Sequence, residues 1–211
     1  MAIKPILFNT EMVRAILGGR KTCTRRLPNK RVVEDYFSYE AWAMSVATDG
    51  CKKKTEKQFY EQYPPYQTGD ILYVRETFYM DENCILYKAD NENLIGYRNM
   101  SGEDISVKWR PSIHMPKEAA RIWLKVTDVR VERLQKCGEG WCIDIEKEGV
   151  TTPQNPILYI SDDEFHDALR TEFQKLWNST IKKSDLDRYG WDANPYVWVI
   201  EFERCEKPED A

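Results

Sequence analysis

The sequence predicts an α+β fold, with a small β-barrel as the centre of a single domain spanning residues 1–211. Three observations support this fold class. Short apolar segments of strand length recur along the chain, strongly periodic helical segments are few, and the last apolar segment is a long strand. Many short strands with one or two helices between them favour a small barrel over a doubly wound parallel sheet.

The N-terminal elements are predicted to be a strand, a helix and a second strand. Residues 5–8 form a short apolar strand, after which Asn9 or Thr10 can cap a helix whose apolar residues share one face. The glycine pair Gly18-Gly19 ends this helix, because glycine readily adopts the left-handed conformation after a helix C-terminus. The next strand is expected at residues 22–26.

The central part of the chain alternates between predicted insertions and strands. Residues 27–68 carry aromatic side chains without a sustained period, and we expect an insertion with a short helix around residues 56–63. A turn at Gly69-Asp70 leads into a strand at residues 71–74. Further strands are expected at residues 84–88, within a second insertion at about 79–120, and at residues 122–131.

The C-terminal part contains the strongest predicted helix and the closing strand. Ser161-Asp162-Asp163-Glu164 has the pattern of a capping box, and it opens a helix with one apolar face. That face carries Phe165, Ala168, Leu169, Phe173, Leu176 and Trp177. The segment 196–202 is long and apolar enough to be a strand in the middle of a sheet.

Charge is distributed unevenly along the chain. The net charge of 31 − 35 = −4 argues against a generic nucleic-acid binder. Residues 1–54, however, carry 11 Lys and Arg against 5 Asp and Glu, a local charge of +6 that leaves −10 for the remainder. The sequence therefore allows a basic face on an acidic protein, although solvated surface lysines explain part of this excess.

Composition also limits the class of protein. No apolar run has the length needed to cross a bilayer, and the N-terminus lacks a secretory apolar region, so a cytoplasmic location is expected. The six cysteines include no C-x-x-C motif, and there are only two histidines, so free thiols are a better interpretation than a zinc site. No Walker or dinucleotide-binding glycine pattern is present, and we expect no cofactor and no metal.

The segment from Gly19 to Arg26 has the clearest chemical potential. Its three arginines and one lysine are donors suited to phosphate, and its two threonine hydroxyls include a possible nucleophile. The alternative is an ordinary amphipathic edge strand with its basic side in water. Composition alone favours that alternative, so the order of the residues has to decide.

That order resembles the ASCH family of the PUA-like β-barrel superfamily. The resemblance rests on three separated blocks: the helix end with Gly19-Arg20-Lys21-Thr22-x-Thr24-x-Arg26, then Gly69-Asp70-Ile71-Leu72-x-Val74, and the closing strand at residues 198–202. It runs from about Pro5 to Phe202. The extra residues at about 27–68 and 79–120 make the chain similar to the longer members carried by phages and prophages.

The resemblance implies a cleft that holds RNA or a modified nucleoside. Small bacterial members of the family are amidohydrolases that remove the acyl group of N4-acetylcytidine with a lysine, a threonine and a glutamate. The first two match Lys21 and Thr24, and the glutamate, expected in a helix after the central strand, matches Glu148, with Glu146 as the second choice.

Amide hydrolysis by these three residues is chemically reasonable. Thr24 attacks the acyl carbon, Lys21 acts as the base once burial or neighbouring arginines lower its pKa, and Glu148 orients the amine or protonates it. Positions three apart on a regular strand point to opposite faces. Lys21 and Thr24 can therefore share a pocket only if Lys21 lies in the turn after Gly19.

Eight further residues are candidates for binding the nucleic acid or substrate. Arg75 and Glu76 follow a strand, where Arg75 contacts either a phosphate or an ion-pair partner, and Trp109 offers either a stacking surface or a packing residue. Asn194 either touches the ligand or makes a turn before the last strand. The remaining four lie in the basic segment: Arg20, Thr22, Arg25 and Arg26.

Three functional hypotheses follow. The first is a hydrolase acting on a modified pyrimidine nucleoside through Lys21, Thr24 and Glu148. The second is a non-catalytic reader of RNA or of a modified nucleotide, in which the basic residues hold phosphate. The third is a ribonuclease that needs no metal and uses Lys21 as its acid and base.

Overall fold

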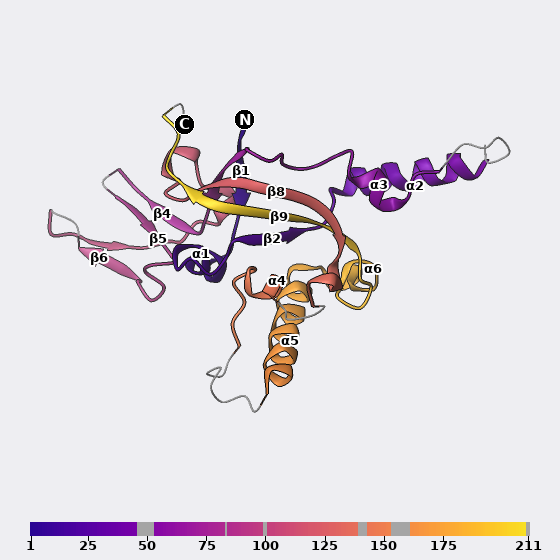
Figure 1. Ribbon diagram of the computed structural model, residues 1–211. Helices are drawn as coiled ribbons and strands as arrows, with labels where there is room; N and C mark the ends of the chain where they lie inside the picture. The colour runs from indigo at the N-terminus through magenta and orange to yellow at the C-terminus, as the bar shows by residue number, and fades with distance from the viewer. Residues whose placement is uncertain (46–52, 83, 99–100, 139–142, 153–160, 210–211) are drawn as a thin grey trace.

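A five-stranded mixed sheet forms the centre of the protein in the computed structural model, which describes residues 1–45, 53–82, 84–98, 101–138, 143–152 and 161–209 (Figure 1). The parallel pair is β1 and β3, and the other neighbours are antiparallel. In order across the sheet the strands are β1 (Ile3–Leu7), β3 (Ile71–Arg75), β8 (Trp123–Arg133), β9 (Tyr196–Cys205) and β2 (Cys23–Arg26).

The predicted α+β class is confirmed, but the sheet is open rather than a closed barrel. Strands β1 and β2 are its two edges, and no strand pairing of the described residues joins them. A side-chain contact links the edges instead, since Arg26 Nη2 donates a hydrogen bond of 2.9 Å to Leu7 O. Residues of both edges line a common cavity, and a closed barrel would need a fifth pairing between these edges.

Strand β9 lies inside the sheet, as the long apolar segment predicted. It pairs with β8 along ten residues, with an irregularity between Val126 and Asp128, and with β2 on its other side. Its side chains alternate between two apolar cores: Val197 and Val199 belong to one, and Trp198 and Ile200 to the other. The sheet therefore separates two cores, and both of its faces are covered at this strand.

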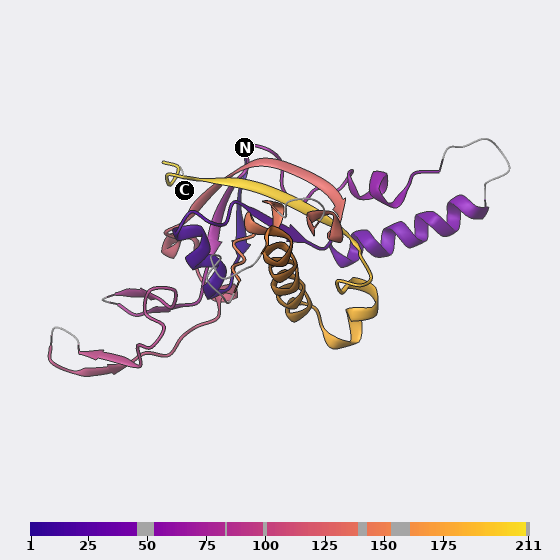
Figure 2. The same cartoon turned by 60° about the horizontal axis from the view of Figure 1, so that its bottom comes forward.

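Helices cover these two faces. Helix α1 (Thr10–Leu17) is capped by Asn9, whose Oδ1 accepts a 2.9 Å bond from Met12 N, and its Val13 and Ile16 enter the core that contains Trp198. Helix α5 (Asp162–Thr180) packs below the other face (Figure 2). Its buried residues are Leu169, Phe173 and Trp177. Two short helices, α4 (Ile143–Glu146) and α6 (Leu186–Tyr189), flank it.

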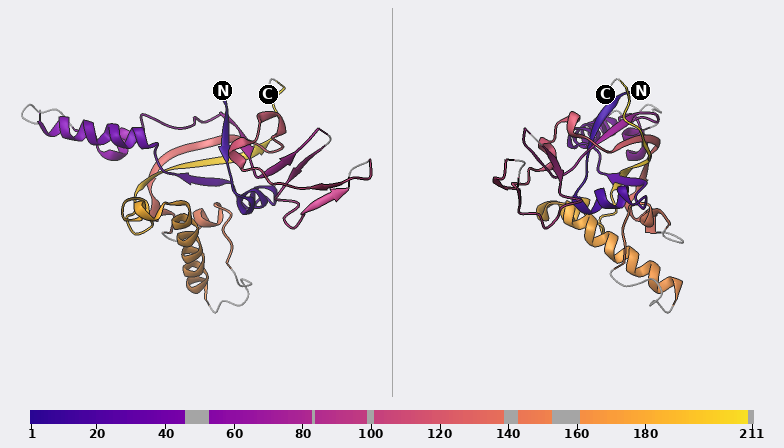
Figure 3. Two further views of the ribbon diagram at one scale, coloured as in Figure 1. Left: turned by 180° about the vertical axis from the view of Figure 1, so that it is seen from behind. Right: turned by 90° about the vertical axis from the view of Figure 1, so that its left-hand side faces the viewer.

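The predicted insertions form two arms that project from opposite ends of the sheet (Figure 3). In the first, α2 (Lys30–Ser45) lies beside α3 (Glu56–Tyr60). The sequence reading missed α2 entirely and extended the second helix to residue 63. The second arm consists of two ribbons, β4 (Phe78–Met80) with β5 (Ile85–Tyr87) and β6 (Gly96–Arg98) with β7 (Asp104–Ser106). Among the described residues, every helix is too short or too polar to cross a membrane.

The turn at Gly69-Asp70 ties the N-terminus to the start of β3. Gly69 has φ +89°, and Asp70 is 4% exposed. The Asp70 carboxylate accepts hydrogen bonds from Ala2 N, Lys4 Nζ and Gln67 N at 2.9, 2.8 and 3.0 Å. Burial by itself raises the pKa of this carboxyl, but the three donors outweigh burial and lower the pKa to about 2.

We expect Asp70→Asn to destabilise the protein in a pH-dependent way. The folded-state pKa lies below the ordinary value of 3.8, so the carboxylate stabilises the fold above that pH, and this contribution is lost as the pH falls toward 2. Urea unfolding should show a loss of about 2 kcal/mol at neutral pH that shrinks on acidification. An equal loss at every pH would contradict this account. Glu203→Gln, whose side chain is 60% exposed, is the control.

Candidate functional site

The end of helix α1 places Lys21 outside regular strand geometry. Gly19 has φ +72°, and the helix closes with a Schellman motif in which Arg20 N bonds Ala15 O at 2.9 Å and Gly19 N bonds Ile16 O at 3.0 Å. Lys21 N also bonds Ala15 O, at 3.1 Å. Strand β2 begins two residues later, so the condition under which Lys21 and Thr24 can face one cavity is met.

A second turn brings Glu148 against Lys21. The two residues form an isolated antiparallel bridge, and Lys147 O accepts hydrogen bonds from Thr22 N at 2.9 Å and Cys23 N at 3.0 Å. The resemblance implied that Glu148 lies within a helix. Helix α4 ends at Glu146, however, so Glu148 lies in the turn that follows this helix.

Gly149 allows this close approach. It has φ +77°, and a Cβ at this position would lie 2.6 Å from Ala15 Cβ and 2.9 Å from Lys21 Cβ. Both the backbone conformation and the available space therefore require glycine.

The Glu148 carboxylate lies between two buried cations. Its Oε2 accepts a 2.8 Å bond from Lys21 Nζ, and its Oε1 accepts a 2.9 Å bond from Arg25 Nη1. Lys21, Arg25 and Glu148 are 3%, 3% and 4% exposed. Lys21 Nζ also donates to Cys23 O at 2.7 Å and to Glu148 O at 2.8 Å, so all three hydrogens of the ammonium have acceptors.

Burial changes the acid–base properties of this cluster. It lowers the pKa of Lys21 from its ordinary value, and the attraction of Glu148 opposes this shift without cancelling it. Burial likewise raises the pKa of the neighbouring Cys23 thiol to about 12. Cys23 therefore stays protonated near neutral pH and is a poor nucleophile, whereas Lys21 loses its proton more readily than an ordinary lysine does.

Lys21, Thr24 and Glu148 line one cavity of about 680 Å³, a volume typical of small-molecule sites. Thr24 is 1% exposed, and no described residue hydrogen-bonds to its hydroxyl. The cavity lies between the edge strands β1 and β2 and helix α5. Six aromatic side chains also line it: Phe8, Tyr63, Tyr66, Phe173, Trp177 and Trp198.

The predicted residues Arg20 and Thr22 do not enter this cavity. Both are exposed and line a second cavity of about 480 Å³, together with Glu146 and Lys147. Lys21 and Glu148 line the first cavity instead. It is therefore Glu148, and not Glu146, that lies beside Lys21. Arg25 and Arg26, by contrast, line the first cavity.

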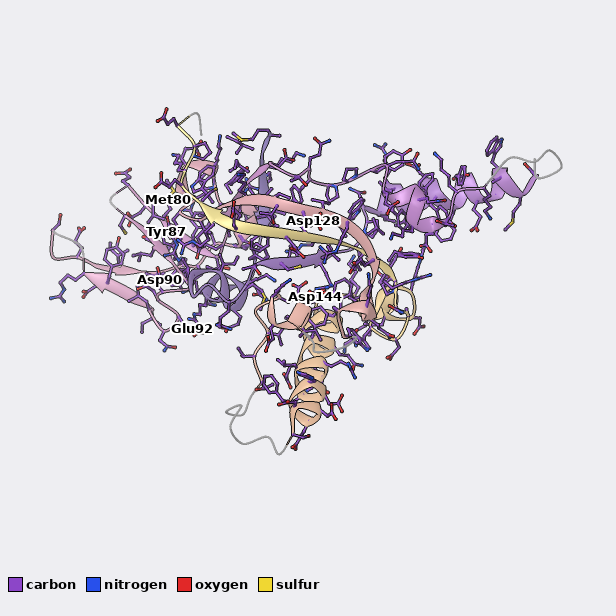
Figure 4. All side chains as sticks on the ribbon, in the orientation of Figure 1. Met80, Tyr87, Asp90, Glu92, Asp128 and Asp144 are labelled. Atoms are coloured by element: carbon purple, nitrogen blue, oxygen red, sulfur yellow. The ribbon has the colours of Figure 1, made fainter. Side chains whose placement is uncertain are left out.

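The predicted binding residues Arg75 and Glu76 line neither of these two cavities. Arg75 Nη1 donates a 3.2 Å bond to Ile113 O. Glu76 is 1% exposed and receives two bonds from Arg121, of 2.8 and 3.0 Å. Arg121 also binds Asp90 and lies 3.9 Å from the centre of the Tyr87 ring; Figure 4 labels Asp90 and Tyr87. This network lies at the second arm, and both oxygens of the Glu76 carboxylate are bonded to Arg121 within it.

Trp109 and Asn194 also line neither cavity. Trp109 is half-buried near the base of the ribbon arm, where Arg110 bridges to Phe78. Asn194 has φ +45°, and its Oδ1 accepts a 2.8 Å bond from Gln135 N. Its geometry supports the turn-making alternative for this residue.

The aromatic lining of the first cavity was not identified as a site from the sequence. Phe8, Tyr66, Trp177 and Trp198 come from four distant segments, and each looks like a core or loop residue in its own segment. The only local signal was Tyr63-Pro64-Pro65-Tyr66, a rigid aromatic turn at the end of the first insertion.

Comparison of the chain with protein-family models, with curated proteins and with solved structures found no match. Over the residues that the structure describes, no group of three or more His, Cys, Asp and Glu side chains is arranged to hold a metal ion.

Proposed function

We propose that this protein is an ASCH-like amidohydrolase that removes an acyl group from the N4 amine of a cytidine-type nucleoside. One observation carries the proposal: Lys21, Thr24 and Glu148 line a single cavity of nucleoside size, although 127 residues separate Lys21 from Glu148. The proposal includes a PUA-like ancestry of the sheet. Its support is that both edge strands line this cavity and are linked by Arg26.

The buried ion pair supplies both the base and the acid. A proton passes from Lys21 Nζ to Glu148 Oε2 across 2.8 Å, and burial, which lowers the pKa of Lys21, favours the neutral amine. Neutral Lys21 takes the hydroxyl proton of Thr24 as Oγ1 bonds to the acyl carbon. Glu148 then returns its proton to N4 as the C–N bond breaks, which releases cytidine and leaves an acyl ester on Thr24.

Water completes the cycle. Its oxygen bonds to the acyl carbon, the ester C–O bond breaks, and the Thr24 oxygen regains a proton as the free carboxylic acid leaves. During both steps the aromatic lining offers flat apolar surfaces for the base. Trp177 and Trp198 are 6% and 3% exposed, so these rings are held rigidly by the two cores.

The proposal predicts that the protein releases cytidine and acetate from N4-acetylcytidine and that Lys21→Met stops this release. Methionine fills the volume of the lysine stem but cannot carry a proton. Chromatography of the products measures turnover, and circular dichroism checks the fold. Lys147→Met, four-tenths exposed and lining the other cavity, is the matched control. No turnover by the native protein, or equal turnover by Lys21→Met, rejects the hydrolase.

One observation favours a non-catalytic reader as the second candidate. Three acceptors surround Lys21 Nζ and stabilise its ammonium form, and an ammonium has no lone pair with which to act as a base. A reader would bind N4-acetylcytidine or RNA and release it unchanged. Binding of RNA that weakens steeply with salt, with no product formed, supports this candidate.

A further inference from the structure

Arg26 is a cation at the cavity that has no carboxylate partner. Lys21 and Arg25 both pair with Glu148, whereas no ion pair within the described residues includes Arg26. The residue as a whole is exposed, but its guanidinium is crowded over the Phe8 ring at 5.3 Å, and this burial lowers its pKa. Glu148 attracts this guanidinium only from beyond ion-pair distance, so a bound anion would give it a closer counter-charge.

The Arg26 guanidinium is held in place with donors to spare. Nη2 donates to Leu7 O at 2.9 Å, and Nη1 donates to Arg25 O at 3.3 Å. A guanidinium carries five N–H groups, so these two bonds leave three. Since the stem and ring are already fixed, little freedom is lost when the remaining groups bind a ligand.

Two asparagines add donors to the same rim. Asn9 Oδ1 accepts Met12 N at 2.9 Å, and Asn29 Oδ1 accepts Arg31 N at 3.0 Å, at the starts of α1 and α2. Their oxygens are thus occupied, while no described residue accepts a bond from either NH₂ group. Both residues are exposed and line the cavity.

The cavity lining has a buried and an exposed part. Lys21, Thr24 and Glu148, each at most 4% exposed, form a buried floor, and the exposed rim includes the donors of Arg26, Asn9 and Asn29 beside other exposed residues such as Tyr63 and Thr180. In a cytidine nucleotide, the exocyclic amine and the phosphate lie at opposite ends of the molecule. A ligand with its amine at the floor directs its phosphate to the rim.

We infer that Arg26, Asn9 and Asn29 form a phosphate subsite, so the ligand of this cavity is a nucleotide unit and not a bare nucleoside. This inference rests on the proposed function only in that a pyrimidine nucleoside occupies the cavity. Charge-assisted bonds from arginine and amide donors are the usual means of holding phosphate. The phosphate belongs either to a free nucleotide or to an RNA strand, and the rim chemistry is the same for both.

Isothermal titration of the full chain with three probes tests the subsite: cytidine, cytidine 5′-monophosphate and a short single-stranded oligocytidylate. We expect the native protein to bind the monophosphate at least about tenfold more tightly than cytidine. Arg26→Gln should reduce this preference to less than about threefold, and because the preference is a ratio of two affinities, a loss common to both probes does not affect it. Arg188→Gln is the matched control, because Arg188 also lies over a ring, at 4.7 Å from Phe37, but does not line the cavity.

A second variant tests the subsite without removing a large side chain. Asn29→Asp keeps the oxygen that caps α2 but replaces the amide donor by a negative charge, so it should also remove the preference for phosphate. Equal affinity of the native protein for cytidine and its monophosphate overturns the subsite and leaves the proposed function standing. Failure to bind any probe rejects both. Tighter binding of the oligomer assigns the phosphate to RNA, and tighter binding of the monophosphate assigns it to a free nucleotide.

Discussion

Thr24→Val should reduce the deacylation of N4-acetylcytidine by about a thousandfold or more in kcat/KM, because it removes the proposed nucleophile. Valine has the shape of threonine and suits a strand. No described residue bonds to the Thr24 hydroxyl, so its loss breaks no hydrogen bond within the described part of the chain. Thermal unfolding should therefore show little change, and the expected defect is confined to the chemical step.

Thr22→Val provides the matched control for this experiment. Thr22 is two residues away, is exposed and lines the other cavity, so its hydroxyl has no part in the proposed reaction. Steady-state kinetics of both variants should show activity close to native for Thr22→Val only. If Thr24→Val keeps activity within about fivefold of native, a covalent intermediate on Thr24 is ruled out, and water must attack directly.

Glu148→Gln should lower the free energy of unfolding by about 3–5 kcal/mol, because it leaves two buried cations without their shared counter-charge. Lys21 and Arg25 are both 3% exposed, and both bond to this carboxylate. For a domain whose total stability is about 5–15 kcal/mol, such a loss is a large fraction. Urea unfolding at neutral pH measures it.

Glu146→Gln separates the effect of the buried pair from a general change of charge. Glu146 lies two residues earlier and is exposed, so its substitution should change stability by less than about 0.5 kcal/mol. Similar stabilities of the two variants would contradict the argument. In that case the ion cluster adds nothing to the fold, and Lys21 must shed its proton when Glu148 is absent.

Elements with a strong local signal were predicted well from the sequence. The Asn9 cap, the glycine stop after α1 and the Ser161 start of α5 all appear where the pattern predicted them. Each depends on contacts between residues a few positions apart, which a local pattern encodes. The same is true of strand β9, whose continuous apolar run is buried on both faces.

Elements that depend on distant partners were predicted poorly. Helix α2 was missed because only Val33 and Tyr36 are buried in it, so its sequence shows no apolar stripe; these two residues pack on α3 and the core. The open sheet was also missed, since β1 and β2 are its edges and no pairing of the described residues joins them. These strands are only five and four residues long, and the sequence of so short a strand does not show which strand it will pair with.

The sequence by itself determined the α+β class, most of the strands and the basic segment in which Lys21 and Thr24 lie. Tertiary structure alone decided that Glu148 meets Lys21, that Arg25 shares its carboxylate, and that Arg26 forms no ion pair with another described residue. It also placed Arg20 and Thr22 in the lining of another cavity and paired Glu76 with Arg121. The physical reason is that a charged group acquires its role from the charges and the solvent around it, and those are set by segments 45 to 127 residues away in the chain.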